Sequence, residues 1–279
     1  MRKAVMTDLK RQSAKATLTR TENFRIAVVV AVNDEETLSR NLLRSQILQD
    51  GRASFRAYRG CRSASEAYNR GLDQTEEEIV VFVHQDVYLP QAWEASLRSA
   101  INALSRRDPD WAVIGAVGSK EDGAIVGRCW SSGLGRVIGT ALDEPTEITC
   151  VDELLIVLRR ASGLRFDSDL PVFHLYGADI VLTALANNLR SYVADLPVIH
   201  NSRPVKGLGG AYALAHDFMR RKWAALLPVP TLIVPLTRSR WPMLRARLHL
   251  ARTLRRRLAR AVDPMANPQD LAKAAGFEP

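Results

Sequence analysis

Three short polar clusters each follow an apolar run in this sequence, and their residue types could bind ligands or carry catalysis. The runs before them are rich in valine and isoleucine, as expected for strands buried on both faces. In open α/β sheets ligands bind beyond the carboxyl ends of the strands. One polar cluster at a strand end is common, but three together favour a shared site. The clusters are Asn33-Asp34-Glu35, His84-Gln85-Asp86 and His200-Asn201-Ser202, after the runs 24–32, 79–83 and 192–199.

Asp86 offers the most specific chemistry of these clusters. It comes shortly after five consecutive apolar residues, Ile79 to Val83, and a carboxylate at that position can bind a divalent metal ion. We expect Mg²⁺ or Mn²⁺, which could bridge the diphosphate of a nucleotide and neutralise a leaving group. His84 would point the same way as Asp86 along a strand, and His200 is a second possible ligand. Each histidine could equally be a surface residue or a satisfied core residue.

Strands and helices alternate along most of the chain, which predicts an α/β fold with a doubly wound, mostly parallel sheet. Apolar runs predict the strands, and apolar residues spaced by three and four predict the helices. The stretch 118–139 is rich in Gly, Ser and Arg and is expected to form loops with short strands. The predicted strands are 24–32, 53–58, 78–83, 111–117, 154–158 and 192–199, and the predicted helices are 38–47, 63–72, 93–104, 177–188 and one between Gly207 and Leu227.

Four segments, in this order, resemble a known family: IAVVVAVND, SEAYNRGL, EIVVFVHQDVYLP and FDSDLPVFHLYGADIVLTALANNLRSYVADLPVIHNS. Together they look like the inverting family 2 glycosyltransferases of the A-type nucleotide-sugar fold. The closest likeness is to the bacterial subgroup whose Asp-x-Asp motif is His-Gln-Asp. The resemblance covers about residues 24–227. It implies a glycosyltransferase A-type fold, with a Rossmann-like, mostly parallel central sheet flanked by helices and here a C-terminal helical extension.

The resemblance implies a nucleotide-sugar pocket at the ends of the first and third strands. Ala31, Asn33 and Asp34 match the end of the first strand, which lines the nucleoside pocket in the family. Asn69 and Gly71 match an Asn-x-Gly that packs near the nucleotide. The donor-binding residues expected on this basis therefore include Asn69 as well as residues at the strand ends.

The same resemblance places the metal motif at His84-Gln85-Asp86, with His84 where the family usually has a carboxylate. Asp86 is the implied metal ligand, and His200 matches a histidine that can complete the metal shell. Asp179 matches the aspartate of the Glu-Asp motif, the usual general base, while Ala178 replaces the glutamate. Alternatively, Asp179 opens an apolar helix and could serve only as an N-terminal cap.

Three further residues are weaker candidates for contacts with the donor or acceptor. Asp152 precedes the predicted strand 154–158, and a solvated turn is the alternative for it. Arg203 and Lys206 follow the last polar cluster and could bind the diphosphate. The Gln-x-x-Arg-Trp signature of processive polysaccharide synthases is absent, because Arg221-Lys222-Trp223 lies near its expected place without the Gln. This difference disfavours a processive synthase.

The net charge of +9 is concentrated near the two ends of the 279-residue chain. Residues 1–20 carry six Lys or Arg against one Asp, and residues 237–262 carry nine Arg and no acid. The 216 residues 21–236 hold 23 basic and 26 acidic side chains. A nucleic-acid-binding domain would carry its own basic surface, so this distribution argues against a nucleic-acid partner.

The sequence predicts three parts: a basic N-terminal extension (1–22), a catalytic domain (23–227), and a Pro-rich linker with a basic amphipathic helical tail (228–279). Three widely spaced cysteines favour a reducing compartment over a zinc site or a disulfide framework. Residues 1–24 lack the apolar core of a secretory signal, and the apolar stretch 224–236 is too short and proline-rich to span a bilayer. We expect a cytoplasmic protein, either free or peripheral at the inner face of the plasma membrane.

The segment 241–262 is predicted to be an amphipathic basic helix, because its apolar residues recur at three and four positions with arginines around them. Three partners fit such a helix: an anionic membrane surface, a second copy or another protein, and nucleic acid, in decreasing order of weight.

These features are most consistent with a glycosyltransferase that moves one sugar from a nucleotide-sugar donor to a hydroxyl acceptor with inversion, assisted by Mg²⁺ or Mn²⁺. The acceptor would be a cell-envelope or other bacterial glycan, free or lipid-linked. A nucleotidyltransferase is one alternative, but it would need a second metal carboxylate and a Gly-rich basic loop after the first strand. A degenerate nucleotide-sugar-binding or assembly protein is the other, suggested by His84 and Ala178 in place of two family carboxylates.

Overall fold

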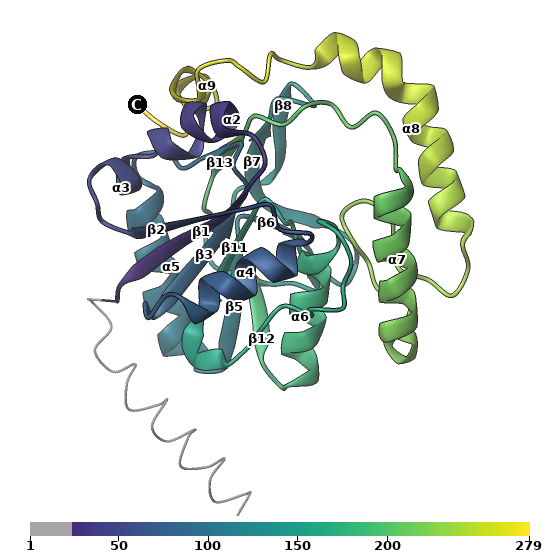
Figure 1. Cartoon of the computed structure of the whole chain (residues 1–279), viewed down its shortest axis with the longest axis horizontal. Helices are drawn as coiled ribbons and strands as arrows, with labels where there is room; N and C mark the ends of the chain where they lie inside the picture. The colour runs from purple at the N-terminus through teal and green to yellow at the C-terminus, as the bar shows by residue number, and fades with distance from the viewer. Residues whose placement is uncertain (1–23) are drawn as a thin grey trace, which may run out of the picture.

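The computed structural model describes residues 24–279 as two sheets with helices packed around the larger one (Figure 1). The predicted N-terminal extension, 1–22, lies outside the described residues. The strands are β1 Ile26–Val32, β2 Ser54–Arg59, β3 Ile79–Val83, β4 Val87–Tyr88, β5 Trp111–Gly115, β6 Val117–Ser119, β7 Ile125–Ser131, β8 Arg136–Thr140, β9 Thr146–Glu147, β10 Cys150–Val151, β11 Leu155–Arg159, β12 Arg190–Val193 and β13 Val198–His200. The α-helices are α2 Glu35–Arg40, α3 Gln46–Gln49, α4 Ala64–Asp73, α5 Trp93–Arg107, α6 Tyr176–Ala186, α7 Gly210–Lys222, α8 Trp241–Arg260 and α9 Pro268–Ala274.

The central sheet has seven strands in the order β2-β1-β3-β11-β5-β12-β9. β1 pairs in parallel with β2 and β3, β11 runs antiparallel to β3 and β5, and β12 is parallel to β5. All strands except β11 and β9 therefore point the same way. The predicted α/β class, with a mostly parallel central sheet flanked by helices, is confirmed.

β1 shows why these strands are apolar throughout. Ala27 and Val29 face the layer that contains α4 and α6, whereas Val28 and Val30 face the layer that contains α2 and α5. Successive side chains of a strand point to opposite faces, so a sheet covered on both faces needs apolar residues at every position. In Figure 1, α4 and α6 cover the near face and α5 lies behind the sheet.

The second sheet has the order β10-β6-β7-β13-β4, with β8 added to β7. The stretch 118–139, expected to be loops with short strands, instead contains seven-residue β7 and most of β8, which pair as a hairpin. The strand predicted over 192–199 is two strands in different sheets, β12 and β13. Pro197 lies between them and lacks the N–H that a continuous central strand would need.

The predicted helix 38–47 is also interrupted. α2 ends at Arg40, a 3₁₀ turn follows at Leu42–Arg44, and α3 is a single short turn. The Asn41 side-chain amide donates to the Thr37 carbonyl at 2.9 Å, and such local bonding of Asn with the backbone competes with helix continuation.

The C-terminal segment packs back on the domain that precedes it. Val229, Val234 and Leu236 of the Pro-rich segment are buried in the same core as α6. The short helix α9, absent from the sequence prediction, packs through Ala272 and through Phe277 beyond its end onto β4 and β13. Figure 1 shows the chain end beside α9 and α2 at the outer edge of the molecule. Among residues 24–279 there is no helix with the length and apolar character needed to cross a membrane.

Candidate active site

The strand pairings bring the three polar clusters to one place. β1 and β3 are parallel neighbours, so Asn33 and His84 leave the sheet at the same edge. β4 starts directly after Asp86 and pairs antiparallel with β13, which puts Val87 opposite His200. The Asn201 N–H donates to the Asp86 carbonyl at 2.9 Å and fastens the two segments together.

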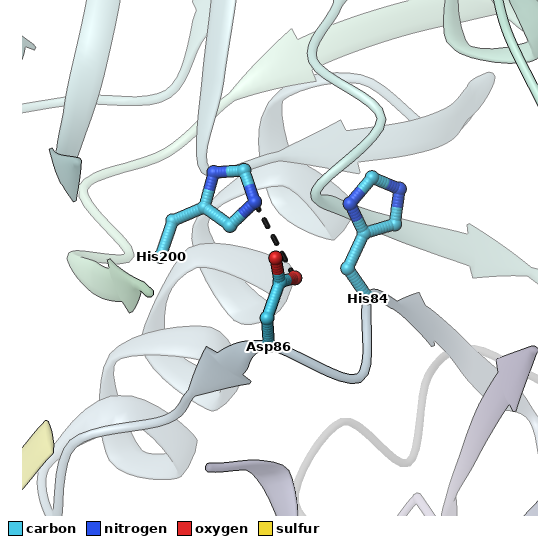
Figure 2. A group of neighbouring side chains, drawn as sticks. All are labelled: His84, Asp86 and His200. Atoms are coloured by element: carbon cyan, nitrogen blue, oxygen red, sulfur yellow. Dashed lines mark ion pairs between the residues drawn. The ribbon is translucent and has the colours of Figure 1, made fainter. Parts of the chain in front are cut away.

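His84, Asp86 and His200 form a compact group in which one nitrogen or oxygen of each lies within 4.8 Å of the others. His200 Nε2 is 3.4 Å from Asp86 Oδ1, and Figure 2 shows the carboxylate between the two imidazole rings. Atoms that share a divalent ion lie at most about 4.4 Å apart, because each is about 2.0–2.2 Å from it. Small side-chain rotations would therefore bring two nitrogens and one oxygen to ligating distance.

The electrostatics of this group keep Asp86 ionised. Burial alone would raise the pKa of Asp86, but the His200 and His84 imidazoles outweigh it and hold that pKa below its ordinary value. Burial is also the largest influence on both histidines. It lowers the pKa of His84, whereas the adjacent Asp86 carboxylate more than compensates at His200 and raises its pKa. Asp86 is thus favoured in its charged form and His84 in its neutral form, as metal ligands must be, whereas a metal ion would have to compete with the proton that Asp86 favours on His200.

The group borders a cleft of about 650 Å³. Five of the predicted donor-binding residues line it: Ala31, Asn33, His84, Gln85 and Asp86. The rest of the lining is mostly aromatic or small and comprises Val32, Tyr58, Gly60, Cys61, Tyr68, Phe173 and Tyr176. A cleft with flat apolar walls and a few polar groups at one end suits a ligand that has both a ring system and charged or hydroxylated parts.

Gln85 fixes the backbone where the chain leaves β1. Its Oε1 accepts from the N–H groups of Asn33 at 3.0 Å and Asp34 at 3.2 Å, and its Nε2 donates to Asn33 Oδ1 at 2.5 Å. The Asp34 carboxylate is directed elsewhere, because it caps α2 by accepting from the Thr37 N–H at 3.0 Å. That bond lowers the pKa of Asp34. The structure thus places Asp34 as the N-cap of α2, next to the cleft-lining Asn33, and the nucleoside contact that the resemblance implied for it stays a prediction.

Tyr176 holds the ring of His84. Its hydroxyl lies 2.7 Å from His84 Nε2 and donates to the Glu153 carbonyl at 3.1 Å. With its only hydrogen used in that bond, the hydroxyl accepts from His84 Nε2–H, which leaves the other ring nitrogen unprotonated. A hydrogen bond to one ring nitrogen commonly orients the other toward a metal. Figure 2 shows that nitrogen on the side of Asp86.

Asn69 lies outside the cleft lining, so the donor contact that the resemblance implied for it stays a prediction. Its side-chain amide donates to the Phe166 carbonyl at 2.8 Å and accepts from the Phe166 N–H at 3.1 Å. Gly71, on the same helix, lets α4 approach β1, since a Cβ there would lie 2.5 Å from Val29 Cγ1. The Asn-x-Gly segment therefore joins α4 to its neighbours and supports the cleft indirectly.

Asn69→Ala is accordingly expected to lower the free energy of unfolding by about 1–2 kcal/mol, because both backbone groups of Phe166 lose their partner. Thermal or urea unfolding measures this change. The affinity for a nucleotide should stay that of the wild type, which calorimetric titration checks. If the nucleotide affinity fell while the free energy of unfolding stayed unchanged, Asn69 would be a ligand-binding residue.

Asp152 and Glu153 lie next to the metal-binding group, because the His84 N–H donates to the Leu154 carbonyl at 3.0 Å. Asp152 Oδ1 accepts from the Leu154 N–H at 3.0 Å. Both acidic residues border a second, smaller pocket of about 70 Å³, which Tyr212 and residues 231–233 close from the other side. Burial, with a contribution from the Asp152 charge, raises the pKa of Glu153 to about 8. Glu153 therefore keeps its proton at neutral pH.

Asp179 lies in the first turn of α6 with 2% of its surface exposed. Lys222 Nζ donates to its two carboxylate oxygens at 2.7 and 2.9 Å, and Trp223 Nε1 donates to Oδ1 at 2.7 Å. Lys222 also pairs with Asp167 at 2.6 Å. Burial raises the pKa of Asp179 although the Lys222 ammonium opposes the shift. The alternative role for Asp179 was to cap the N-terminus of α6. The N-cap residue of α6 is Leu175, and no side chain that the structure describes makes a capping hydrogen bond to this helix.

Arg203 and Lys206 lie exposed on the segment between β13 and α7 and are not part of the cleft lining. The Arg203 charge contributes, as the smallest of several influences, to the lowered pKa of Asp34.

Comparison with known proteins identifies the family. A family model described as a glycosyltransferase-like family matches residues 27–193, more than half of the chain. The chain belongs to this family. The matched range contains all but the first residue of β1, the His84-Gln85-Asp86 segment and Asp179, whereas His200 lies beyond it.

This glycosyltransferase-like chain is also similar to one known protein sequence and to several solved structures. It is 29% identical over 147 residues to the "ATP synthase subunits region ORF 6" protein of Fuscovulum blasticum, covering 48% of this chain and 55% of that protein. The chain thus spans about half the length of that relative.

Two of the similar structures are mannosyltransferase PcManGT from Pyrobaculum calidifontis, in complex with GDP-Man and Mn²⁺, and GalNAc-T7, with UDP, GalNAc and Mn²⁺. The first is 13% identical, covers 98% of this chain and 90% of that chain, and has a TM-score of 0.43. The second is 12% identical, covers 71% and 48%, and has a TM-score of 0.47. S. aureus TarS 1–349 is 15% identical, covers 74% and 66%, and has a TM-score of 0.44. At scores below 0.5 these likenesses establish neither fold nor activity.

Several residues of the glycosyltransferase-like site were not predicted from the sequence. Tyr68 and Tyr176 reach the cleft from α4 and α6, and Lys222 reaches Asp179 from the end of α7. Tyr176 stands three positions before Asp179, one helical turn, and that spacing is the only signal in the sequence that links it to the site. Lys222 lies 43 residues from Asp179, and its place in Arg221-Lys222-Trp223, near the expected position of the Gln-x-x-Arg-Trp signature, did not indicate a contact with Asp179.

Proposed function

We propose that this chain transfers a sugar from a nucleotide-sugar donor to a hydroxyl acceptor, with inversion, using a divalent ion held by His84, Asp86 and His200. The observation that carries the proposal is the grouping of these three side chains, two of which, His84 and Asp86, line an aromatic-walled cleft. Membership of a glycosyltransferase-like family supports it.

The cleft is suited to hold the donor in one orientation. Its aromatic and apolar walls offer stacking surface to a nucleoside, and the Gln85 clamp holds the adjoining backbone of Asn33 rigid. The diphosphate would then point toward Asp86. Arg203 and Lys206, on the exposed segment after β13, are the proposed partners of its outer oxygens.

The donor atoms favour Mn²⁺ over Mg²⁺. Mg²⁺ prefers an all-oxygen octahedral shell, whereas two imidazoles and one carboxylate suit a transition metal. When bound, the ion would supply positive charge that stabilises the diphosphate as it leaves. The contribution of this chain is to orient the ligands: Tyr176 holds the His84 ring, and the pairing of β4 with β13 sets His200 beside Asp86.

Asp179 is the proposed general base. Its carboxylate would accept the proton of the acceptor hydroxyl while that oxygen forms a bond to the anomeric carbon of the sugar. The bond from that carbon to the diphosphate oxygen breaks at the same time, and its electron pair leaves with the nucleoside diphosphate. Lys222 and Trp223 occupy three of the roughly four acceptor positions of a carboxylate, so about one remains for the acceptor hydroxyl.

The experiment that tests the proposal is a screen of nucleotide sugars for donor turnover, by transfer or by slow hydrolysis, with and without EDTA. We expect EDTA to lower the rate at least about 100-fold, Mn²⁺ to restore it, and Mg²⁺ to restore it less. Donor binding without turnover for any sugar would instead identify a nucleotide-sugar-binding protein without transfer. The nearly complete enclosure of Asp179 is the observation that favours this second candidate. Turnover that is insensitive to EDTA would contradict the metal assignment.

A further inference from the structure

α8 is firmly attached to the rest of the chain through one of its faces. Met243 is buried in the large core, and Ala246 and Leu250 pack against that core. Arg247 Nε donates to the Leu208 carbonyl at 3.2 Å, and Arg257 also donates to the carbonyl of Val205. The orientation of the helix is therefore fixed, and its opposite face is fixed with it.

The opposite face carries a stripe of exposed apolar side chains. Trp241 is 59% exposed, Leu244 47%, Leu248 44% and Leu258 47%. At about 100° per residue these positions fall within roughly 100° of the helix circumference. A helix that packs on its own domain through one apolar stripe usually has a polar outer face, so a second apolar stripe facing solvent calls for a partner.

Arginines that have no acidic partner border the exposed stripe along one side. At about 100° per residue, five exposed arginines lie between the stripe itself and roughly 100° beyond its Trp241 edge, and no α8 arginine pairs with a carboxylate among residues 24–279. Arg240, just before the helix, does pair with Asp217 at 3.0 Å. The positions are Arg245, Arg252, Arg255, Arg256 and Arg260.

We propose that the outer face of α8 binds the surface of an anionic lipid bilayer, with the helix lying in the plane of the interface. An apolar stripe bordered by arginines, with a tryptophan at one end, is the pattern that partitions between headgroups and acyl chains. Each arginine adds attraction to anionic headgroups. A second copy of the same helix would be repelled by five like charges, and nucleic acid would leave the leucines without a partner. The inference stands on α8 alone and does not depend on the proposed sugar transfer.

Vesicle binding of the full chain tests the charged part of the surface. We expect sedimentation with vesicles of phosphatidylcholine and phosphatidylglycerol, and none with phosphatidylcholine alone. The double variant R245E/R252E should lower the partition coefficient more than about tenfold. The matched control R56E/R106E changes the net charge equally at exposed arginines elsewhere and should bind like the wild type.

A second pair of variants tests the apolar stripe at constant charge. L244S/L248S should weaken vesicle binding, whereas L185S/I125S, which alters two exposed apolar residues on α6 and β7, should not. The fluorescence of Trp241 should shift to shorter wavelength with mixed vesicles, and W241F should remove that shift. Circular dichroism melting confirms that each variant is folded.

Three results would overturn the proposal. The first is failure of the wild type to bind mixed vesicles, and the second is binding by both α8 variants at the level of the wild type. The third is that the protein does not bind vesicles and instead uses α8 to form a dimer or a complex with an oligonucleotide.

Discussion

Asp86→Asn is expected to lower kcat/KM for sugar transfer by about 10³-fold, with little change in folding. The amide has the shape of the carboxylate but no charge. The variant would keep the two imidazoles of His84 and His200 but would lose the only carboxylate among the three metal-binding side chains. The expected size of the loss reflects the several kcal/mol that a bound divalent ion contributes to stabilising a departing diphosphate. Initial rates with excess Mn²⁺, together with a direct Mn²⁺ titration of the donor-free protein, measure both consequences.

Two companion variants make the Asp86 result specific. Asp122→Asn makes the same chemical change at an exposed carboxylate that pairs with Lys120, and it should leave rates and Mn²⁺ affinity unaltered. His200→Gln should weaken Mn²⁺ binding in the same direction as Asp86→Asn. If Asp86→Asn binds Mn²⁺ as the wild type does and turns over donor at the same rate, the metal site has been assigned to the wrong residues.

Much of the framework of this site could be predicted from the sequence because it depends on local signals. The apolar runs of β1 and β3 are long and unambiguous, and the polar residues after them must lie at a sheet edge. Ser63 caps α4 as its position before a helical pattern suggests, accepting from the Glu66 N–H at 3.2 Å. The cleft lining includes Ala31 and Asn33 for the same reason.

The rest depends on contacts that no local pattern encodes. β11 is as apolar as β1, so nothing in its residues distinguishes the antiparallel direction that it takes between β3 and β5. β7 and β8 contain glycine and are partly exposed, so composition alone indicated loops with short strands. Asn69 matched a family motif by spacing, yet its hydrogen bonds go to Phe166, 97 positions away. Side chains such as Lys222 reach the site only because α7 packs against α6, a tertiary outcome.

Asp179→Asn is expected to lower kcat by about 10²- to 10⁴-fold, the range over which a positioned general base contributes. The amide cannot accept the proton of the acceptor hydroxyl. Lys222 keeps its ion pair with Asp167 in this variant, so the ammonium is not left buried without a counter-ion and the fold should survive. Donor affinity, measured by calorimetry, should remain that of the wild type, because the base acts on the acceptor.

Glu153→Gln is the matched comparison, since Glu153 follows Asp152 in the segment next to the metal-binding group and desolvation raises its pKa to about 8. A protonated acid at neutral pH is a poor base, so this variant should lose far less activity than Asp179→Asn. The reverse order of the two losses would assign the base to Glu153 and leave Asp179 as a structural partner of Lys222 and Trp223.

The pH profile separates a base from a residue that only supports the fold. Burial raises the pKa of Asp179, and the Lys222 ammonium works against that rise. Replacing Lys222 with methionine removes the opposing charge, so the pKa of Asp179 should rise further and the acidic limb of the kcat profile should move to higher pH. The limb should move in the same direction, by less, in high salt if screening reaches the pair. If the acidic limb of the kcat profile lies at the same pH in Lys222→Met as in the wild type, the group that titrates in that limb is not Asp179.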